Sequence, residues 1–308
     1  MRLRGLGVTR VQIGIQSLDD RILALNNRGH DMEAARRACR LLRAAGFKLL
    51  LHWMPNLYSA TPDSDREDFA RLWTDPDMQP DELKIYPCAL VEETELHDLW
   101  RQGRFVPYDE QTLIDLLADC KAQTPVYCRL SRVVRDIPSD YVVEGNRLSN
   151  LREAVQARLA ATGRSCRCIR CREVGAHVVE VDALQLRVTR IHTGAGQEHF
   201  IAAETPAGQL AGFLRLLLPG GQVERPQELE GSAIIREVHV YGPALGIGAA
   251  SGGEAQHLGL GGRLLAAAED IARRDGWGDL AVIAALGTRD YYRRRGFQLD
   301  KLYMHKRL

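Results

Sequence analysis

The sequence predicts an α/β protein in which the later part of a β/α barrel is followed by a smaller α+β domain. Over residues 1–130, short apolar runs alternate with helical patterns, as strands and helices do in such a barrel. Near residue 234, a run rich in β-branched residues precedes a glycine-rich turn and a helix. The 308 residues, of which 45% are hydrophobic, suffice for two cores. We therefore expect a barrel part at 1–130, a linking segment at 131–180 and a second domain at 181–308.

Four strands separated by helices are expected in the barrel part. The apolar run at 11–15 predicts the first strand, and Ser17 is a suitable N-cap for the helix after it. The next helix begins at Asp31 and ends at Gly46, a residue type that favours helix ends. The remaining elements are a strand at 47–53, a helix at 64–73, a strand at 82–86, a helix at 111–121 and a strand at 126–134. Strands joined by helices rather than hairpins predict a parallel sheet.

Two expectations follow from the strand ends and the unpaired edge of this predicted sheet. Chemistry in β/α barrels lies at the carboxyl ends of the strands, and the polar residues at or just beyond these ends include Gln16, Ser17, Lys84 and Tyr86. Four strands cannot close a barrel, so the strand at 11–15 would have an unpaired edge. We expect that a second copy of the chain covers this edge, or that the missing N-terminal strands belong to a segment outside this sequence.

Charge and hydropathy narrow the function classes. Lys and Arg number 41 and Asp and Glu number 40, so the net charge of +1 does not by itself indicate nucleic acid, membrane or an acidic partner. No apolar run reaches the ~18 residues of a membrane span, and the N-terminus lacks the apolar core of a signal peptide. We expect a cytoplasmic protein that does not enter a membrane.

A local surplus of positive charge lies at residues 129–172. This segment has ten arginines, no lysine and four acidic residues, a surplus of six positive charges. Arg129, Arg132 and Arg135 follow one another at intervals of three, and their guanidinium groups can bind the phosphates of a nucleic acid. A solvated face with surface ion pairs is an equally good interpretation of the pattern.

Three of the seven cysteines lie within six residues. Cys166, Cys168 and Cys171 have a C-x-C-x-x-C spacing, which lets three thiolates bind one zinc ion. His177 and Cys128 are the candidates for a fourth ligand. The alternative is three reduced cysteines in an arginine-rich turn.

The C-terminal part begins with a strand at 234–241. The alternation of side chains along a strand places Glu237, His239 and Tyr241 on one face. It places Val238 and Val240 on the other face. Three polar side chains on one face of a strand favour a binding-site wall.

A glycine-rich turn then leads into a helix. Gln256, Gly259 and Gly261 form a Q-x-x-G-x-G pattern, whose backbone N–H groups can approach a pyrophosphate at the helix N-terminus. The inner face of the helix carries Leu264, Leu265, Ala268 and Ile271. The elements after it are a strand at 280–286, a helix at 289–295 with Tyr291 and Tyr292, and a strand at 298–305. A glycine-rich cap beside two packed tyrosines is the weaker alternative, and a Rossmann site is disfavoured because G-x-G-x-x-G is missing.

This order of elements resembles the GNAT acetyltransferase fold, in which Q-x-x-G-x-G binds acetyl-CoA and a tyrosine can protonate the leaving thiolate. The resemblance extends to nearly the whole chain through the strings GIQS, LKIYP, RVVRDIP, CREVG, REVHVYG, QHLGLG and GTRDYYRRRGF. Together they are similar to the catalytic subunits of Elongator, which join a radical-SAM barrel to a GNAT domain and modify the wobble uridine of tRNA.

The resemblance implies an acyltransferase that uses acetyl-CoA and S-adenosyl-L-methionine (SAM) to place a carboxymethyl group on C5 of that uridine. It also implies zinc at the three cysteines, tRNA on the arginine-rich segment, and a SAM pocket at Gln16, Ser17, Lys84 and Tyr86. The implied catalytic residues are Glu237, His239, Tyr291 and Tyr292. The implied acetyl-CoA contacts are Glu237, Val238, His239, Val240, Gln256, Gly259, Leu260, Gly261, Gly262, Arg263 and Tyr292.

The sequence departs from that family in its cysteines. The 4Fe-4S cluster of radical-SAM enzymes needs three closely spaced cysteines near the N-terminus, and no cysteine precedes Cys39 here. We therefore expect a SAM pocket without its iron–sulfur half and no radical step by this chain alone. The alternative functions are a tRNA-binding module that senses acetyl-CoA without catalysis, and a GNAT enzyme that acts on an amine or a protein lysine.

Overall fold

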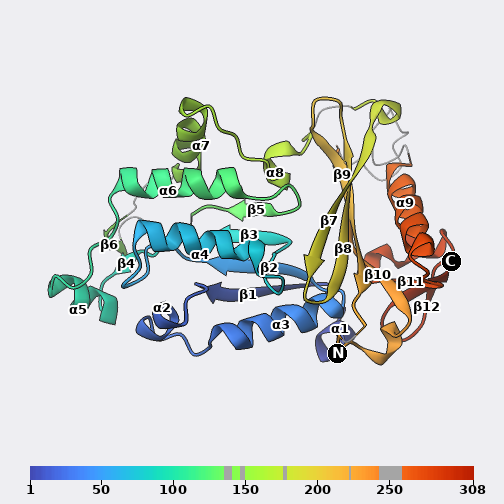
Figure 1. Cartoon of the computed structure of the whole chain (residues 1–308), viewed down its shortest axis with the longest axis horizontal. Coiled ribbons are helices and arrows are strands. Elements are labelled where there is room, and N and C mark those ends of the chain that lie inside the picture. The colour runs from blue at the N-terminus through green and yellow to red at the C-terminus, as the bar shows by residue number, and fades with distance from the viewer. Residues whose placement is uncertain (135–140, 146–149, 176–178, 222, 243–258) are drawn as a thin grey trace. The chain divides into compact units, whose positions relative to one another are not determined.

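The computed structural model describes residues 1–134, 141–145, 150–175, 179–221, 223–242 and 259–308 (Figure 1). The chain forms two compact units. The parallel-sheet unit consists of Gln12–Ala38 and Leu50–Cys171, and the mixed-sheet unit consists of Met1–Val11, Cys39–Leu49 and Arg172–Leu308. No helix in the described part of the chain combines the length and the apolar character needed to span a membrane.

The parallel sheet has the strand order β1-β2-β3-β5, and the registers between β2 and β3 and between β3 and β5 are parallel. Its strands are β1 (Arg10–Gln16), β2 (Lys48–Trp53), β3 (Glu82–Ile85) and β5 (Arg129–Arg132). The helices along this part of the chain are α1 (Arg2–Gly5), α2 (Asp20–Leu25), α3 (Met32–Ala44), α4 (Pro62–Thr74), α5 (Glu95–Arg101), α6 (Glu110–Gln123), α7 (Leu151–Ala161) and α8 (Ile169–Arg172). Helices α4 and α6 lie side by side, and α7 packs on α6 (Figure 1). The predicted alternation of strands and helices is confirmed.

Local sequence explains most helix starts in this unit. Thr61 and Ser64 exchange side-chain and backbone hydrogen bonds in a capping box at α4, and Pro62 occupies the first turn. The predicted N-cap of α2 is wrong, because Asp19, not Ser17, accepts the N–H groups of the first turn. Ser17 instead donates its hydroxyl to Asp68 at 3.2 Å. The last predicted strand is shorter than expected, and a small antiparallel pair, β4 (Leu90–Val91) with β6 (Val142–Glu144), was not expected.

The mixed sheet has seven strands in the order β12-β13-β11-β10-β9-β8-β7. They are β7 (Gln185–Thr193), β8 (Gly196–Glu204), β9 (Leu210–Pro219), β10 (Ser232–Val240), β11 (Asp279–Val282), β12 (Gln298–Leu299) and β13 (Met304–Arg307). The helices of this part are the 3₁₀ turns η2 (Val181–Ala183), η3 (Gln227–Leu229) and η4 (Leu286–Thr288) and the α-helices α9 (Leu260–Arg274) and α10 (Arg289–Arg293). Helix α9 packs on β8, β9 and β10 through the apolar face that its spacing predicts (Figure 1).

Two predicted strands of this sheet differ from the structure. The strand at 280–286 ends at Val282, because the chain then turns into η4. The single strand at 298–305 is a hairpin in which Gln298 pairs with His305. The turn of this hairpin is held by Glu228, whose carboxylate accepts the backbone N–H groups of Leu302 and Tyr303, both at 2.8 Å. A partner so distant in sequence leaves no trace in the local pattern.

Candidate functional site

The first candidate site lies where two parallel strands of the mixed sheet stop pairing. β10 pairs with β11 from Ser232 opposite Asp279 to Ile235 opposite Val282. It then continues along β9 to Val240, after a register shift between Ile235 and Glu237. Irregularities of this kind are frequent next to active sites, because they redirect the side chains that follow. Residues 237–240, which the sequence assigned to acetyl-CoA, form this continuation of β10.

The N-terminus of α9 is suited to bind an anion. Gly259 is the N-cap residue, with a left-handed φ of 80° and no side-chain cap among the described residues. The first N–H groups of this 15-residue helix have no acceptor within the helix, and the helix dipole favours negative charge there. At Gly261 a Cβ atom would clash with the hydroxyl of Tyr291. The two glycines are thus required for different reasons, one by its backbone conformation and one by a close neighbour.

The two predicted tyrosines have different surroundings. Tyr291 is half-buried, its hydroxyl lies beside Gly261, and the guanidinium carbon of Arg295 is 3.6 Å from its ring centroid. Tyr292 is 7% exposed and packs edge-on against Phe297, with ring centroids 5.6 Å apart. Burial raises the pKa of both hydroxyls. Both stay protonated at neutral pH, and Tyr291 has its hydroxyl at the N-terminus of α9.

The predicted polar face of β10 is engaged with neighbouring side chains. Glu237 accepts from Lys48 Nζ at 2.6 Å and from Arg215 Nε at 3.0 Å. His239 is exposed, and its ring centroid is 4.3 Å from that of Tyr241. The carboxylate of Glu237 is thus held by ion pairs with Lys48 and Arg215. Val238 and Val240 pack against the core as their alternation predicts.

The remaining predicted acetyl-CoA residues divide into three groups. Leu260 is buried, whereas Gly262 would have open space around an added Cβ atom. Arg263 donates to the backbone carbonyls of Val181 at 2.6 Å and Leu184 at 3.2 Å, so its guanidinium is committed to the η2 segment. Gln256 lies outside the described residues.

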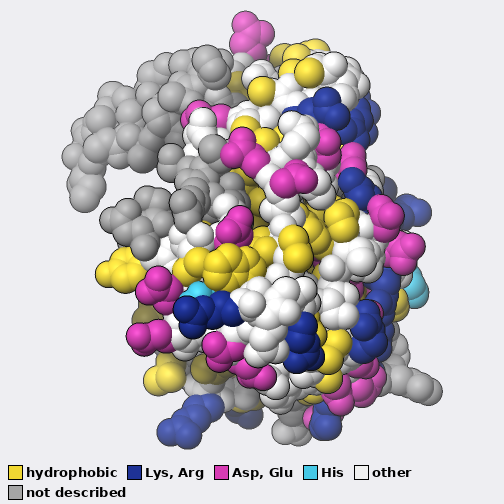
Figure 2. Space-filling model, turned by 90° about the vertical axis from the view of Figure 1, so that its left-hand side faces the viewer, with side chains coloured by type: hydrophobic (Ala, Val, Ile, Leu, Met, Phe, Trp, Pro, Cys, Tyr) yellow, Lys and Arg dark blue, Asp and Glu magenta, His cyan; other side chains and the backbone are white. Residues whose placement is uncertain are grey.

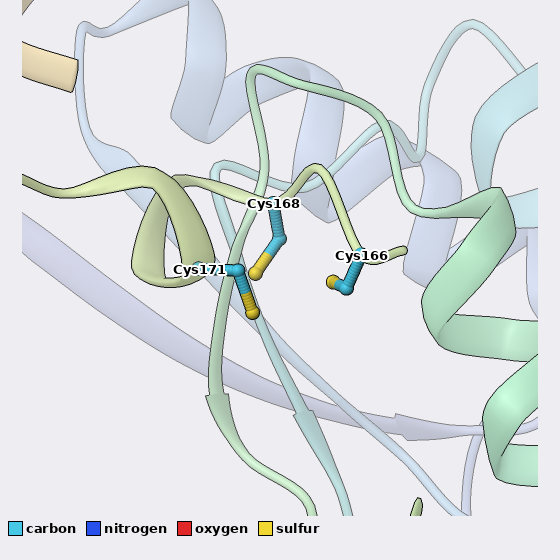
Figure 3. A group of neighbouring side chains, drawn as sticks. All are labelled: Cys166, Cys168 and Cys171. Carbon is cyan, nitrogen blue, oxygen red and sulfur yellow. The ribbon is translucent and has the colours of Figure 1, made fainter. Parts of the chain in front are cut away.

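The second candidate site is the cysteine triad. Cys166, Cys168 and Cys171 have sulfur atoms that all lie within 4.8 Å of one another, and Figure 3 shows these side chains gathered at α8. Cys166 and Cys168 are buried and Cys171 is exposed. Hydrogen bonds from the thiols of Cys166 and Cys171 lower the pKa of Cys168, so this trio readily holds a thiolate. Of the two candidates for a fourth ligand, Cys128 is not part of the cluster and His177 lies outside the described residues.

A lysine lies beside the triad. Lys121 on α6 is 1% exposed and donates to Gln156 at 2.9 Å. Burial lowers the pKa of its ammonium group, and the nearby cysteines oppose this effect. The negative charge of a metal-bound thiolate cluster would thus have a cation next to it.

The third candidate site lies on the parallel sheet. Lys84 Nζ donates to Gln12 Oε1 at 2.9 Å, and His52 Nε2 is 3.1 Å from the same oxygen. The ring centroid of Tyr86 is 5.4 Å from that of His52. Lys84 and Tyr86 therefore belong to one polar group. Gln12 is not among the residues predicted from the sequence, although a glutamine inside an apolar strand was the signal that could have identified it.

The other two residues predicted for the SAM pocket have structural partners. Gln16 is 7% exposed and has a positive φ of 66°. Its carbonyl accepts the N–H of Met54 at 2.8 Å and so links the ends of β1 and β2. Ser17 faces Asp68 in a buried network.

The arginine-rich segment contains both exposed and engaged side chains. Arg129 is half-buried and Arg132 is exposed on β5, while Arg135 lies outside the described residues. Arg170 donates to the carbonyl of Ser131 at 2.7 Å.

On the face shown in Figure 2, basic and acidic side chains are interspersed, with hydrophobic side chains between them. Among its described side chains, this face does not carry charge of a single sign.

Comparisons with known proteins extend these observations. The profile of the Radical SAM superfamily matches residues 1–72, and that of the Radical_SAM C-terminal domain matches residues 80–161. A tRNA uridine(34) acetyltransferase of Dehalococcoides mccartyi is 39% identical over 313 residues, which cover 100% of this chain and 68% of that protein. The chain belongs to the tRNA uridine(34) acetyltransferase family. Elongator complex protein 3 of Danio rerio is 38% identical over 310 residues, which cover 99% of this chain and 57% of that protein.

A solved structure agrees with this assignment. The archaeal Methanocaldococcus infernus Elp3 with an N-terminal deletion superposes with a TM-score of 0.89 and 34% identity, over 100% of this chain and 74% of that chain. The predicted fold class, a barrel part followed by an acetyltransferase domain, is confirmed. The chain spans 57% of the Danio rerio relative and 68% of the Dehalococcoides relative, so both are longer than this sequence.

Membership of the radical-SAM superfamily implies SAM and a 4Fe-4S cluster. The cysteine triad does not fit the position of such a cluster. The N–H of Ile169, between Cys168 and Cys171, donates to the carbonyl of Cys128 at 2.9 Å, immediately before β5 begins. Gln16 and Tyr86 lie at the opposite, carboxyl ends of the parallel strands. Thiols at the amino end of β5 cannot hold a cluster that binds SAM at the carboxyl ends.

Proposed function

We propose that this chain carries the acetyl-CoA-binding and tRNA-binding parts of an enzyme that places a carboxymethyl group on C5 of the tRNA wobble uridine. The proposal rests on three features of the mixed-sheet unit. They are the part of β10 that extends beyond its pairing with β11, the N-terminus of α9 with no side-chain cap among the described residues, and the hydroxyl of Tyr291 beside Gly261. The tRNA substrate is inferred from the relatives that are named tRNA uridine(34) acetyltransferase. As a functional division we keep a barrel part at 1–130, a linking segment at 131–180 and an acetyltransferase part at 181–308.

In this proposal, acetyl-CoA binds along β10 with its pyrophosphate at the first turn of α9. Backbone N–H groups of Gly261 and Gly262 hold the pyrophosphate, while Arg263 supports the loop behind the helix. Water attacks the thioester carbonyl carbon, the C–S bond breaks to leave a carboxylate, and Tyr291 donates its proton to the departing sulfur of coenzyme A. The raised pKa of Tyr291 keeps that proton in place at neutral pH.

The cysteine triad holds zinc in this proposal. Three sulfur atoms within 4.8 Å of one another match ions whose Zn–S bonds are about 2.3 Å long. Zinc would fix the segment before α8, next to the strand that carries Arg129 and Arg132. Together with Arg135, these arginines bind tRNA phosphates.

SAM binds at the carboxyl ends of the parallel strands in this proposal. Lys84 and Tyr86 contact it from the polar group around Gln12, whereas Gln16 and Ser17 shape the loop after β1. This position agrees with the place of chemistry in β/α barrels.

Acetyl-CoA turnover tests the proposal. The purified chain should hydrolyse acetyl-CoA slowly and should do so faster when tRNA is added. Tyr291→Phe should lower the stimulated rate by about 100-fold or more, as for loss of a general acid. Tyr292→Phe is the matched control, because the hydroxyl beside Gly261 belongs to Tyr291. Binding of acetyl-CoA without turnover would favour the sensing module, and tRNA-independent transfer to an amine would favour the amine-directed enzyme.

A further inference from the structure

A cluster of side chains in the mixed-sheet unit lies apart from the residues assigned to acetyl-CoA. Glu228 at η3, Asp300 in the β12–β13 turn and His305 on β13 each offer one ligand atom, and these atoms lie within 4.8 Å of one another. They line a pocket of about 740 Å³. None of the three is predicted from the sequence, because they are separated along the chain and follow no motif.

The imidazole of His305 has one nitrogen fixed and one nitrogen without a partner. Nδ1 lies 2.8 Å from Asp279 Oδ2, and Ser232 Oγ donates to the same oxygen at 2.6 Å. A carboxylate only accepts, so Nδ1 carries the proton. Nε2 is buried and has no hydrogen-bond partner among the described residues. A carboxylate that orients the far nitrogen of a histidine in this way is a common feature of metal sites.

The surroundings of Nε2 favour a positively charged partner. Its nearest carboxylate oxygen is Glu228 Oε1 at 3.9 Å, which is too far for a hydrogen bond. An unprotonated nitrogen that faces a carboxylate presents one lone pair to another, which is repulsive. Two ligand atoms that share one ion with bonds of about 2 Å lie roughly 3–4 Å apart. The observed separation therefore suits an ion between them better than a shared proton.

The cations that line the same pocket do not occupy this position. Lys306 Nζ binds Glu269 Oε1 at 2.6 Å, and Arg307 is exposed. Glu228 is anchored by the N–H groups of the hairpin turn, so its carboxylate is held in place before any ion arrives.

We propose that Glu228, Asp300 and His305 bind a divalent first-row transition ion, with Zn²⁺ as the best match. One imidazole and two carboxylates are the ligand types that Zn²⁺ accepts, and Asp279 orients the imidazole. Three protein ligands leave a position toward the pocket for water or for a ligand from solvent. The ion would tie η3 to the β12–β13 hairpin.

Metal stoichiometry of the whole chain tests this site. The chain is stripped with a chelator and titrated with Zn²⁺, and the cysteine triad and the proposed site should take up two equivalents together. His305→Asn keeps a donor for Asp279 and removes Nε2, so it should leave one equivalent. In a Cys166→Ser, Cys168→Ser and Cys171→Ser background, one equivalent should remain and should be lost on His305→Asn. His192→Asn replaces an exposed histidine on β7 and is the matched control, which should bind as the parent does.

Two further variants sharpen the test. Asp279→Asn should weaken Zn²⁺ binding about 10-fold to 100-fold, as loss of an outer carboxylate does elsewhere. Asp300→Asn removes an exposed ligand without touching the anchored Glu228, so it tests the site even if changes at Glu228 prevent folding. Equal uptake by the parent and His305→Asn would overturn the proposal. So would an NMR spectrum in which Nε2 of His305 carries a proton that excess Zn²⁺ does not displace.

Discussion

The two units bury ionisable side chains in different ways. In the mixed-sheet unit, Glu198 is 0% exposed and bonds to Arg236 and, at 3.2 Å, to Arg43. In the parallel-sheet unit, Asp65 is 5% exposed and accepts from the hydroxyl of Tyr108 at 2.9 Å and the N–H of Asn56 at 2.8 Å. The first carboxylate meets permanent cations, whereas these two hydrogen-bond donors to the second, both among the described residues, are neutral.

This difference decides how each unit responds to its surroundings. A guanidinium group keeps its charge at every accessible pH, so the buried pairs of the mixed-sheet unit are fixed. Burial raises the pKa of Asp65 to about 7, and the cysteine triad in the same unit offers thiols that a metal can deprotonate. The buried carboxylate of Asp65 therefore responds to pH, whereas that of Glu198 is held by permanent cations.

The largest expected effect is at the cysteine triad. Cys168→Ser removes the thiol whose pKa is lowered, and zinc content should fall from near one equivalent at this site to almost none. Structural zinc sites have apparent binding free energies of about 10 kcal/mol or more, so chelation should also increase hydrogen exchange around α8. Elemental analysis and exchange measurements check this, with Cys88→Ser as the control outside the triad. An unchanged zinc content in Cys168→Ser would show that the triad does not hold zinc.

The second-largest effect is expected at the buried ion pairs of Glu198. Glu198→Gln keeps the shape of the side chain and takes the shared carboxylate from Arg43 and Arg236. Because a buried pair broken on one side leaves an uncompensated charge, we expect the free energy of unfolding to fall by about 3–5 kcal/mol. Urea titration measures this change in the free energy of unfolding. Asp290→Asn breaks an exposed pair with Arg293 and should leave stability nearly unchanged, so similar values for both variants would contradict the assigned role of burial.

Asp65 gives the parallel-sheet unit a pH dependence. Its pKa is about 7 in the folded chain and about 3.9 in an unfolded one, so the folded state binds the extra proton between these values. The contribution of Asp65 to stability is complete below pH 4, decreases as the pH rises through about 7, and changes by up to about 1.4 kcal/mol per pH unit in that window. Asp65→Asn keeps an acceptor for Tyr108 and should abolish this part of the profile. Parallel profiles for variant and parent would show that Asp65 does not titrate in this range.

The smallest expected effect is at the N-terminus of α9. Gly261→Val displaces the hydroxyl of Tyr291 and should weaken acetyl-CoA binding by about tenfold, or about 1.4 kcal/mol. Gly278→Val is the control, since an added Cβ there meets nothing within 4 Å. Calorimetry measures both affinities. A wild-type affinity in Gly261→Val would mean that this anion site, which depends on backbone rather than on buried charge, lies elsewhere.

Some elements could be predicted and others could not, for identifiable reasons. The strands β1 and β2 follow from apolar runs between helical patterns, and the end of α3 follows from Gly46 with its φ of 83°. The predicted N-cap of α2 was wrong because Ser17 and Asp19 are both good cap residues, and in the folded chain Ser17 donates to Asp68 instead. The turn between β12 and β13 could not be found, because the acceptor that holds it is Glu228.

The sequence by itself determined the order of elements, the family resemblance and the close spacing of the three cysteines, because each depends on residues near one another in the chain. The tertiary structure decided which partners the functional side chains meet. It joined Glu237 to Lys48 and Arg215, placed the hydroxyl of Tyr291 beside Gly261, and brought His305 toward Glu228. These choices depend on strand register and on contacts between distant segments, and neither is encoded in a local pattern.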